Sequence, residues 1–148
     1  METLADNHKA HSNKLIIRTF IHDDIADIVS ILKQNSLYDG FDTINDFHVL
    51  TENETIVGAV QIVPYPAYYF LSYMATRLGL HNKGLGSYLI NNLLITVDKP
   101  VYLYTIIPEF YKRFGFNIIK NQDTLPEKDD AVCKFCIPEK CRTMKWTP

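Results

Sequence analysis

Two glycines, Gly84 and Gly86, and the lysine before them form the part of this sequence best suited to binding an anion. The apolar run 69–75 ahead of them is typical of a buried strand, and apolar residues repeat at helical spacing over 84–97. The first turn of such a helix has backbone N–H groups without an acceptor inside the helix, and its dipole favours negative charge. Glycine has no Cβ and adopts positive φ at little cost, so an anion can approach the backbone closely. With the cation of Lys83, the segment predicts a phosphate-binding loop.

The spacing of these residues differs from that of the two commonest nucleotide-binding loops. A P-loop carries its lysine after the last glycine, and a dinucleotide fingerprint carries three glycines. Residues 81–86 instead resemble the acetyl-CoA pyrophosphate loop of the GNAT superfamily of N-acetyltransferases, [QR]-x-x-G-x-[GA], with His81 in the place of Gln or Arg. The alternative is a glycine-bearing loop that only turns a corner, which a lone G-x-G would favour.

A second segment, 108–116, strengthens the resemblance. It is similar to the a-x-x-F-Y-x-x-x-G-F segment that GNAT proteins carry at this distance after the loop. The two ordered motifs cover 70–119, and the order of strands before them also fits the family. The matching residues of the second motif are Phe110, Tyr111, Gly115 and Phe116.

The resemblance implies direct attack of an amine on the thioester of acetyl-CoA, which is the co-substrate. In the family, two parallel strands splay apart near the end of the strand expected over 68–76 and leave amides for the pantetheine arm. A backbone N–H there would stabilise the thioester oxygen as it becomes negative. The cofactor-binding residues so assigned are Met74, Ala75, Thr76, His81, Asn82, Lys83, Gly84, Leu85, Gly86 and Ser87.

Tyr111 is the catalytic residue that the resemblance implies. A thiol has an ordinary pKa of about 8.5, and the departing sulfur of CoA is a better leaving group when it is protonated. Tyr111 matches the family tyrosine that is usually given this acid role, and a helix places it on a different face from Phe110 and Phe114. The alternative is a core tyrosine whose hydroxyl has a partner within the protein.

The base that removes a proton from the amine is not marked in the sequence. Glu109 could equally be a favourable charge in the first turn of a helix. The polar segment 35–46 could border a substrate site or be a surface loop. The candidate bases are Glu52, Glu54, Glu109 and His48, and the candidate substrate contacts are Tyr38, Asp39, Phe41 and Asp42.

The elements that must position these residues follow from periodicity, turns and proline positions. The fold class is α/β with a mixed sheet, a GNAT-like acyl-CoA N-acyltransferase fold of six to seven strands with helices on both faces. Gly58 indicates a bulge, and residues 52–54 a hairpin turn. Strands are expected over 14–20, 47–51, 55–63, 68–76, 101–105, 116–119 and 141–146, and helices over 23–34, 84–97 and 109–114, with a short helix near 37–41 as an option.

The composition narrows the class of protein. The chain has 148 residues, of which 47% are hydrophobic, so we expect a single acetyltransferase domain over 14–148. Residues 1–13 are polar, and we expect them to form a flexible tail. A net charge of −2 without a basic patch argues against a nucleic-acid partner. Since no apolar run approaches the length of a membrane span and the N-terminus lacks the apolar core of a signal peptide, we expect no membrane partner and a cytoplasmic location.

The C-terminal region carries a finer resemblance. Residues 125–128, Leu-Pro-Glu-Lys, followed by Cys133, Cys136 and Cys141 look like the end of a GNAT subgroup that includes the acetyltransferase domain of N-acetylglutamate synthases. This resemblance implies an amino-acid α-amine as substrate. The three thiols could hold zinc or iron, although a fourth ligand is missing, or they are small thiols without a metal.

The sequence therefore predicts an acetyl-CoA-dependent N-acetyltransferase that acts on a primary amine of a small molecule or amino acid. The alternatives are a protein N-terminal or lysine acetyltransferase, a non-catalytic acyl-CoA-binding regulatory domain, and a metal-dependent module built on the cysteines. Homodimers are common among proteins of this resemblance, so a homodimer is also an expectation.

Overall fold

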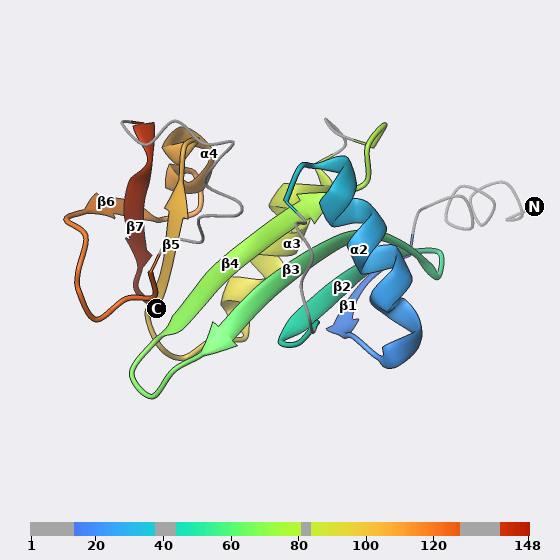
Figure 1. Cartoon of the computed structure of the whole chain (residues 1–148), viewed down its shortest axis with the longest axis horizontal. Coiled ribbons are helices and arrows are strands. Elements are labelled where there is room, and N and C mark those ends of the chain that lie inside the picture. Colours follow the sequence, from blue (N-terminus) through green and yellow to red (C-terminus); the bar gives the residue numbers. More distant parts are fainter. Residues whose placement is uncertain (1–13, 38–43, 81–83, 128–139) are drawn as a thin grey trace, which may run out of the picture.

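The described residues of the computed structural model, 14–37, 44–80, 84–127 and 140–148, form one mixed sheet of seven strands in the order β1-β2-β3-β4-β5-β7-β6 (Figure 1). The predicted sheet of six to seven strands is thereby confirmed. The predicted tail over 1–13 and the optional helix near 37–41 fall wholly or largely outside these residues. The strands are β1 Leu15–Thr19, β2 Phe47–Glu52, β3 Thr55–Pro64, β4 Tyr69–Thr76, β5 Val101–Thr105, β6 Asn117–Ile119 and β7 Arg142–Trp146. The helices are the 3-10 turn η1 His22–Asp24, α2 Ile25–Gln34, α3 Leu85–Ile95 and α4 Pro108–Lys112.

The hairpin β2–β3 follows the prediction. Asn53 and Glu54 both have positive φ, 51° and 72°, as the centre of a tight hairpin turn requires. The predicted bulge is also present, because the register shifts from Leu50 opposite Gly58 to Thr51 opposite Ile56.

The helices cover both faces of the sheet, as predicted. In Figure 1, α2 lies on the near face and α3 on the far face. The α2 face buries a cluster that includes Ile28, Ile31 and Phe47, whereas the α3 face buries a larger cluster that includes Leu89 and Ile90. Helix α3 ends two residues before the predicted end at Val97. The hydroxyl of the next residue, Thr96, donates to the carbonyl of Leu93 at 2.7 Å, an interaction that competes with the helical ladder.

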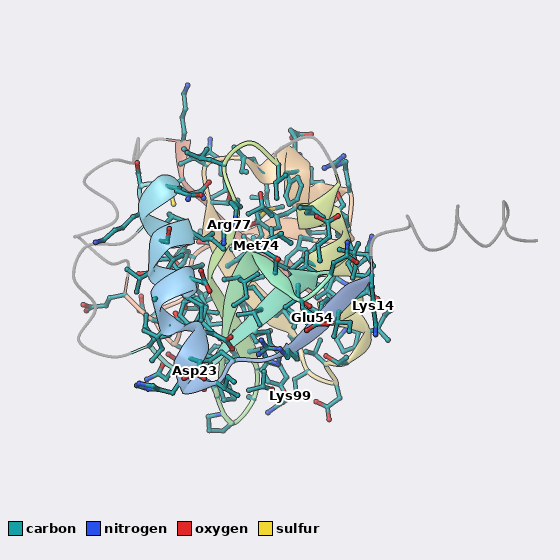
Figure 2. The ribbon with its side chains drawn as sticks, turned by 90° about the vertical axis from the view of Figure 1, so that its right-hand side faces the viewer. Lys14, Asp23, Glu54, Met74, Arg77 and Lys99 are labelled. Atoms are coloured by element: carbon teal, nitrogen blue, oxygen red, sulfur yellow. The ribbon has the colours of Figure 1, made fainter. Side chains whose placement is uncertain are left out.

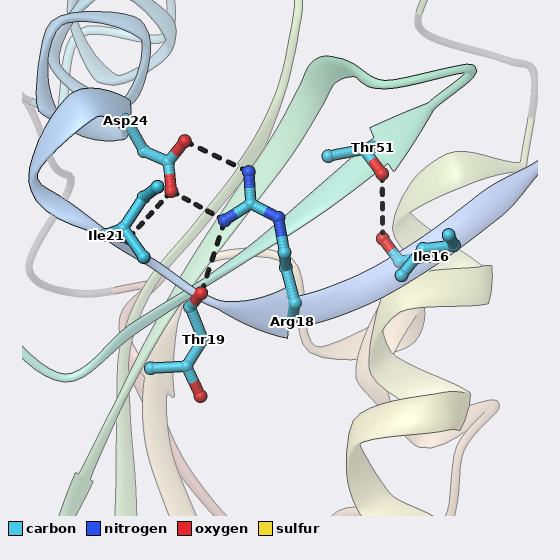
Figure 3. A network of polar contacts seen from close by, with 6 residues as sticks. All are labelled: Ile16, Arg18, Thr19, Ile21, Asp24 and Thr51. Carbon is cyan, nitrogen blue, oxygen red and sulfur yellow. Dashed lines mark hydrogen bonds and ion pairs between the residues drawn. The ribbon is translucent and has the colours of Figure 1, made fainter.

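The start of α2 is fixed by a buried carboxylate (Figure 3). Asp24 accepts two hydrogen bonds from the guanidinium of Arg18, at 2.7 and 3.0 Å, and a third from the backbone N–H of Ile21 at 2.8 Å. The hydrogen bond from Arg18 is the main reason why the pKa of Asp24 lies below its ordinary value. A charged pair thus ties β1 to the turn that begins α2.

The parallel pair β4–β5 is short. Only Tyr69 opposite Val101 and Phe70 opposite Tyr102 are paired, and beyond them the two strands diverge, as the ribbons in Figure 1 show. The expectation that two neighbouring parallel strands separate near the end of β4 is confirmed.

One face of the C-terminal part of the sheet is packed with aromatic residues. The hydroxyl of Tyr68 donates to the carbonyl of Thr124 at 3.0 Å, and that of Tyr104 donates to the carbonyl of Pro126. Leu125, between these two carbonyls, is buried against Phe70 and Tyr102. None of the described helices is long and apolar enough to cross a bilayer.

Candidate functional site

A cavity of about 520 Å³ opens where β4 and β5 diverge. Residues 74–76 at the end of β4 form one wall, and residues 84–87 at the start of α3 form another. The loop before α4 and α4 itself close a third side. The other lining residues are Asn35, Leu80, Ile107, Phe110, Tyr111 and Arg113.

The cavity collects all of the predicted site residues that the structure describes. Met74, Ala75 and Thr76 lie on its strand wall, Gly84, Leu85, Gly86 and Ser87 on its helix wall, and Tyr111 on its α4 side. His81, Asn82 and Lys83 lie outside the described residues. Segments far apart in the sequence thus meet at one place.

Gly84 makes the turn that starts α3. Its φ of 76° is left-handed, and its carbonyl accepts the first helical hydrogen bond from the N–H of Tyr88 at 3.0 Å. The positive φ would strain any side chain here, even though a Cβ would meet no atom within 4 Å. The N–H groups of the first turn after Gly84 have no acceptor inside the helix and lie at the cavity wall.

Gly86 differs from Gly84 in its backbone conformation. It lies within α3 and has no positive φ. A Cβ built on it would stand 3.6 Å from Cζ of Phe110, an ordinary van der Waals contact, so Gly86 lies against the Phe110 ring of α4. Gly86 therefore forms part of the cavity wall next to Phe110 and does not relieve backbone strain.

The end of β4 presents backbone groups to the cavity. The N–H of Arg77 donates to the carbonyl of Val57 on β3 at 2.8 Å. Every second residue of an antiparallel strand directs its N–H and C=O groups to the same neighbour, so Ala75 also faces β3. Met74 and Thr76 then direct theirs to the opposite edge, from which β5 has separated.

Tyr111 is almost fully enclosed, with 8% of its surface exposed. Its ring packs edge-on against Phe110 and Phe116, with centroids 5.0 and 5.7 Å away. Burial raises the pKa of its hydroxyl to about 12. Because of this raised pKa, the hydroxyl is protonated at any physiological pH. Within the described part of the chain it makes no hydrogen bond, so Tyr111 offers a donor at the cavity wall.

The four candidate bases do not line the cavity. Glu109 is exposed in the first turn of α4 and pairs with Lys112 at 2.8 Å. Figure 2 shows Glu54 beside Lys14, apart from Met74 and Arg77 at the end of β4. Glu52 ends β2, next to the same hairpin turn.

His48, the fourth candidate base, lies in β2 opposite Val60. Its Nδ1 is buried and has no hydrogen-bond partner among the described residues. Burial lowers its pKa below the ordinary value, more than the charge of Asp46 raises it, so the ring is neutral at pH 7. The candidate substrate contacts Tyr38, Asp39, Phe41 and Asp42 lie outside the described residues.

Two polar residues of the cavity were not found from the sequence. Asn35 follows α2 and is distant in the sequence from the two motifs, and only the folded chain brings it to the cavity. Arg113, whose guanidinium lies 4.9 Å from the ring centre of Phe110, is the one charged residue among the described lining residues. Its place two residues after Tyr111 in the second motif could have identified it.

The three cysteines near the C-terminus are the candidate metal ligands. Cys141 is a free, half-buried thiol, and Cys133 and Cys136 lie outside the described residues. No group of three potential metal ligands occurs within 14–37, 44–80, 84–127 and 140–148.

Comparison with known proteins gives both a family and a fold. A family model described as an acetyltransferase (GNAT) domain matches residues 43–118. No curated protein sequence matches the chain.

Among solved structures, N-acetylglutamate synthase from Neisseria gonorrhoeae, complexed with coenzyme A and N-acetyl-glutamate, superimposes with a TM-score of 0.67 at 15% identity, over 91% of this chain and 35% of that one. The chain thus spans about a third of that synthase. Rv2747 from Mycobacterium tuberculosis, in complex with CoA and NLQ, gives 0.65 at 17% identity, over 90% and 99% of the two chains. Arabidopsis thaliana Naa50, in complex with the bisubstrate analogue CoA-Ac-MVNAL, gives 0.62 at 16% identity, over 90% and 99%. At these identities the similarity establishes the shared fold.

Proposed function

Because the chain belongs to the GNAT acetyltransferase family, we propose that it transfers the acetyl group of acetyl-CoA to a primary amine of a small molecule or amino acid. The observation that carries the proposal is the meeting of three features in one cavity. These are the first-turn amides of α3, the open edge of β4 and the protonated hydroxyl of Tyr111.

The helix wall of the cavity is suited to the pyrophosphate of acetyl-CoA. The turn at Gly84 leaves the N–H groups of Leu85, Gly86 and Ser87 without helical acceptors, and the dipole of α3 favours negative charge at this end. Arg113 adds a positive charge on the same cavity. In this proposal His81, Asn82 and Lys83 complete the loop.

The strand wall is suited to the pantetheine arm and the thioester. Where β5 leaves β4, the backbone groups of Met74 and Thr76 face the cavity, so the arm can take the place of the missing strand. An N–H group at this edge can donate to the thioester oxygen as it becomes negative in the tetrahedral intermediate. We assign this donor to the N–H of Met74. The carbonyl of Thr76 at the same edge is held by the side chain of Asn35, the residue that follows α2.

Tyr111 supplies the proton for the leaving thiolate in this scheme. The amine nitrogen bonds to the carbonyl carbon, the carbon–sulfur bond breaks, and the sulfur takes the hydroxyl proton of Tyr111. The proton lost by the amine restores that hydroxyl, so an amide and the free thiol are the products. With a pKa of about 12, Tyr111 is not ionised beforehand and releases its proton only as negative charge develops on the sulfur.

Two classes of acetyl acceptor are candidates, and each is supported by one of the similar structures. The synthase from Neisseria gonorrhoeae is complexed with N-acetyl-glutamate, the product of acetylating an amino acid. Naa50 is complexed with an analogue that joins CoA to a peptide, which favours a protein N-terminus. The resemblance of residues 125–128 and the cysteines to the synthase subgroup supports the small acceptor, which we therefore put first.

The test is titration calorimetry of acetyl-CoA on the wild-type chain and on two variants of one position. Gly86→Glu places a carboxylate near the proposed pyrophosphate position, whereas Gly86→Gln adds a neutral side chain of the same size. We expect saturable binding to the wild type, a loss of at least 30-fold in affinity for Gly86→Glu, and a several-fold smaller loss for Gly86→Gln, because the charge adds repulsion to the shared steric cost.

Circular dichroism of both variants provides the control for folding. Folded wild-type protein that does not bind acetyl-CoA would contradict the proposal, as would equal losses for the two variants. With binding established, release of free thiol in the presence of amino acids and of short peptides separates the two acceptor classes. Binding without thiol release for any of them would favour the regulatory alternative.

A further inference from the structure

Asn35, the residue that follows α2, connects this helix to the open edge of β4. Its side-chain nitrogen Nδ2 donates to the carbonyl of Ile31 at 2.8 Å and to the carbonyl of Thr76 at 2.9 Å. The carbonyl of Thr76 is a strand-edge acceptor, to which an N–H group of β5 would donate if the two strands stayed paired. Asn35 thus satisfies an edge group that the separation of the strands leaves without a partner strand.

The two hydrogen bonds also fix the orientation of the amide. Both acceptors are carbonyl oxygens, so the atom between them must be the nitrogen, and both of its N–H groups are used. Oδ1 is then the remaining polar atom of the side chain, and no described residue donates to it. Asn35 itself lines the cavity.

Asn35 approaches the cavity from the side opposite to the proposed cofactor loop. Helices α2 and α3 pack on opposite faces of the sheet (Figure 1). Since the cavity is lined both by the start of α3 and by the residue after α2, it passes through the gap between β4 and β5. A cofactor held at α3 leaves the α2 side for the second substrate.

We propose that Oδ1 of Asn35 accepts a hydrogen bond from the N–H of the acceptor amine and so positions its lone pair toward the thioester. This inference rests on the proposed function and adds a substrate-positioning residue to it. A primary amine has N–H groups to donate while its lone pair attacks, and a fixed, uncharged carbonyl oxygen can hold one of them without competing for the proton. The rigidity comes from the two bonds of Nδ2.

The neighbouring residue provides a matched control. Oε1 of Gln34 accepts the N–H of Leu78 at 2.9 Å, so Gln34 also ties the end of α2 to the segment that leaves β4. Gln34 does not line the cavity. Gln34→Ala therefore removes a comparable structural contact without touching the proposed acceptor position, whereas Asn35→Ala removes the contact and Oδ1 together.

The experiment measures binding of two coenzyme A derivatives and needs no knowledge of the natural acceptor. In one, a –CH2–CO–NH–CH2CH3 group on the sulfur places an N–H where the acceptor amine would be. In the other, a methylene group replaces that N–H. We expect the wild type to bind the N–H derivative about tenfold more tightly, which corresponds to about 1.4 kcal/mol and is the strength of one good hydrogen bond.

The ratio of the two affinities separates the outcomes. It should fall to about one in Asn35→Ala and stay near ten in Gln34→Ala. A ratio near one in the wild type, or one that Asn35→Ala leaves at ten, overturns the inference while the proposed function stands. If neither derivative binds to folded wild-type protein, the proposed function fails, and the inference fails with it.

Discussion

The two ends of β4 differ in how they meet β5. At the first end, Tyr69 and Phe70 pair with β5, and an aromatic cluster packs over the pairing. At the other end, Met74 and Thr76 face a cavity, and the carbonyl of Thr76 is held by Asn35 instead of by a strand. We call them the closed end and the open end.

The difference shows how a sheet can offer backbone groups to a ligand without losing its stability. At the closed end, the ring of Phe70 packs edge-on against Tyr104 with centroids 4.9 Å apart, and Leu125 is buried in the same cluster. This packing holds β5 beside β4 over the two paired residues, and β5 diverges from β4 beyond them. The side chains of the closed end provide stability, and the backbone of the open end provides the binding edge.

Truncation of Phe70 should disrupt the packing of the closed end, and among the changes considered it should lower stability the most. Phe70→Ala removes a side chain that is 5% exposed, and the cavity left behind should lower the free energy of unfolding by about 3–5 kcal/mol. Urea denaturation measures this loss. Acetyl-CoA affinity of the folded variant should change by less than about threefold, because the open end does not contact this ring.

Phe70→Leu is the control for that experiment, since it keeps part of the apolar volume and should lose about 1–2 kcal/mol. A Phe70→Ala variant of unchanged stability that no longer bound acetyl-CoA would place the ligand at the closed end and reverse the comparison.

Removing the hydroxyl of Tyr111 should damage the open end alone. We expect Tyr111→Phe to lower kcat by about 100-fold, which corresponds to about 2.7 kcal/mol, with the affinity for acetyl-CoA changed less than threefold. Because burial raises the pKa of Tyr111 to about 12, ionisation of this residue should not reduce wild-type kcat up to about pH 10. Steady-state thiol release over this pH range provides both readouts.

An active Tyr111→Phe variant would remove the acid role and leave Tyr111 as a packing residue between Phe110 and Phe116. A variant that loses acetyl-CoA binding as well as turnover would instead indicate that the hydroxyl helps to hold the cofactor.

Features that depend on neighbours in the sequence were predictable. The hairpin turn at Asn53 and Glu54, the left-handed Gly84 and the proline that begins α4 follow from local backbone chemistry. For Gly86 the expected positive φ was wrong, because this residue lies within α3, whereas the close approach of an anion to its backbone stays a prediction.

Features that depend on distant contacts were not predictable. Asn35 reaches the site through a hydrogen bond to Thr76, 41 residues later. The placement of β7 between β5 and β6 depends likewise on pairing that no local pattern encodes. The base for the amine also has no local signature, and none of its four candidates lies at the cavity.

The most direct measurement is a titration of the isotope-labelled protein with coenzyme A, followed by backbone amide NMR. The open end should respond: the amide signals of Met74, Gly86 and Ser87 should move and saturate together. Those of Phe70 and Tyr102 at the closed end should stay within the range of unaffected residues. Saturable shifts centred on Phe70 and Tyr102, or no saturable shift at all, would contradict the assignment of the open end as the acetyl-CoA site.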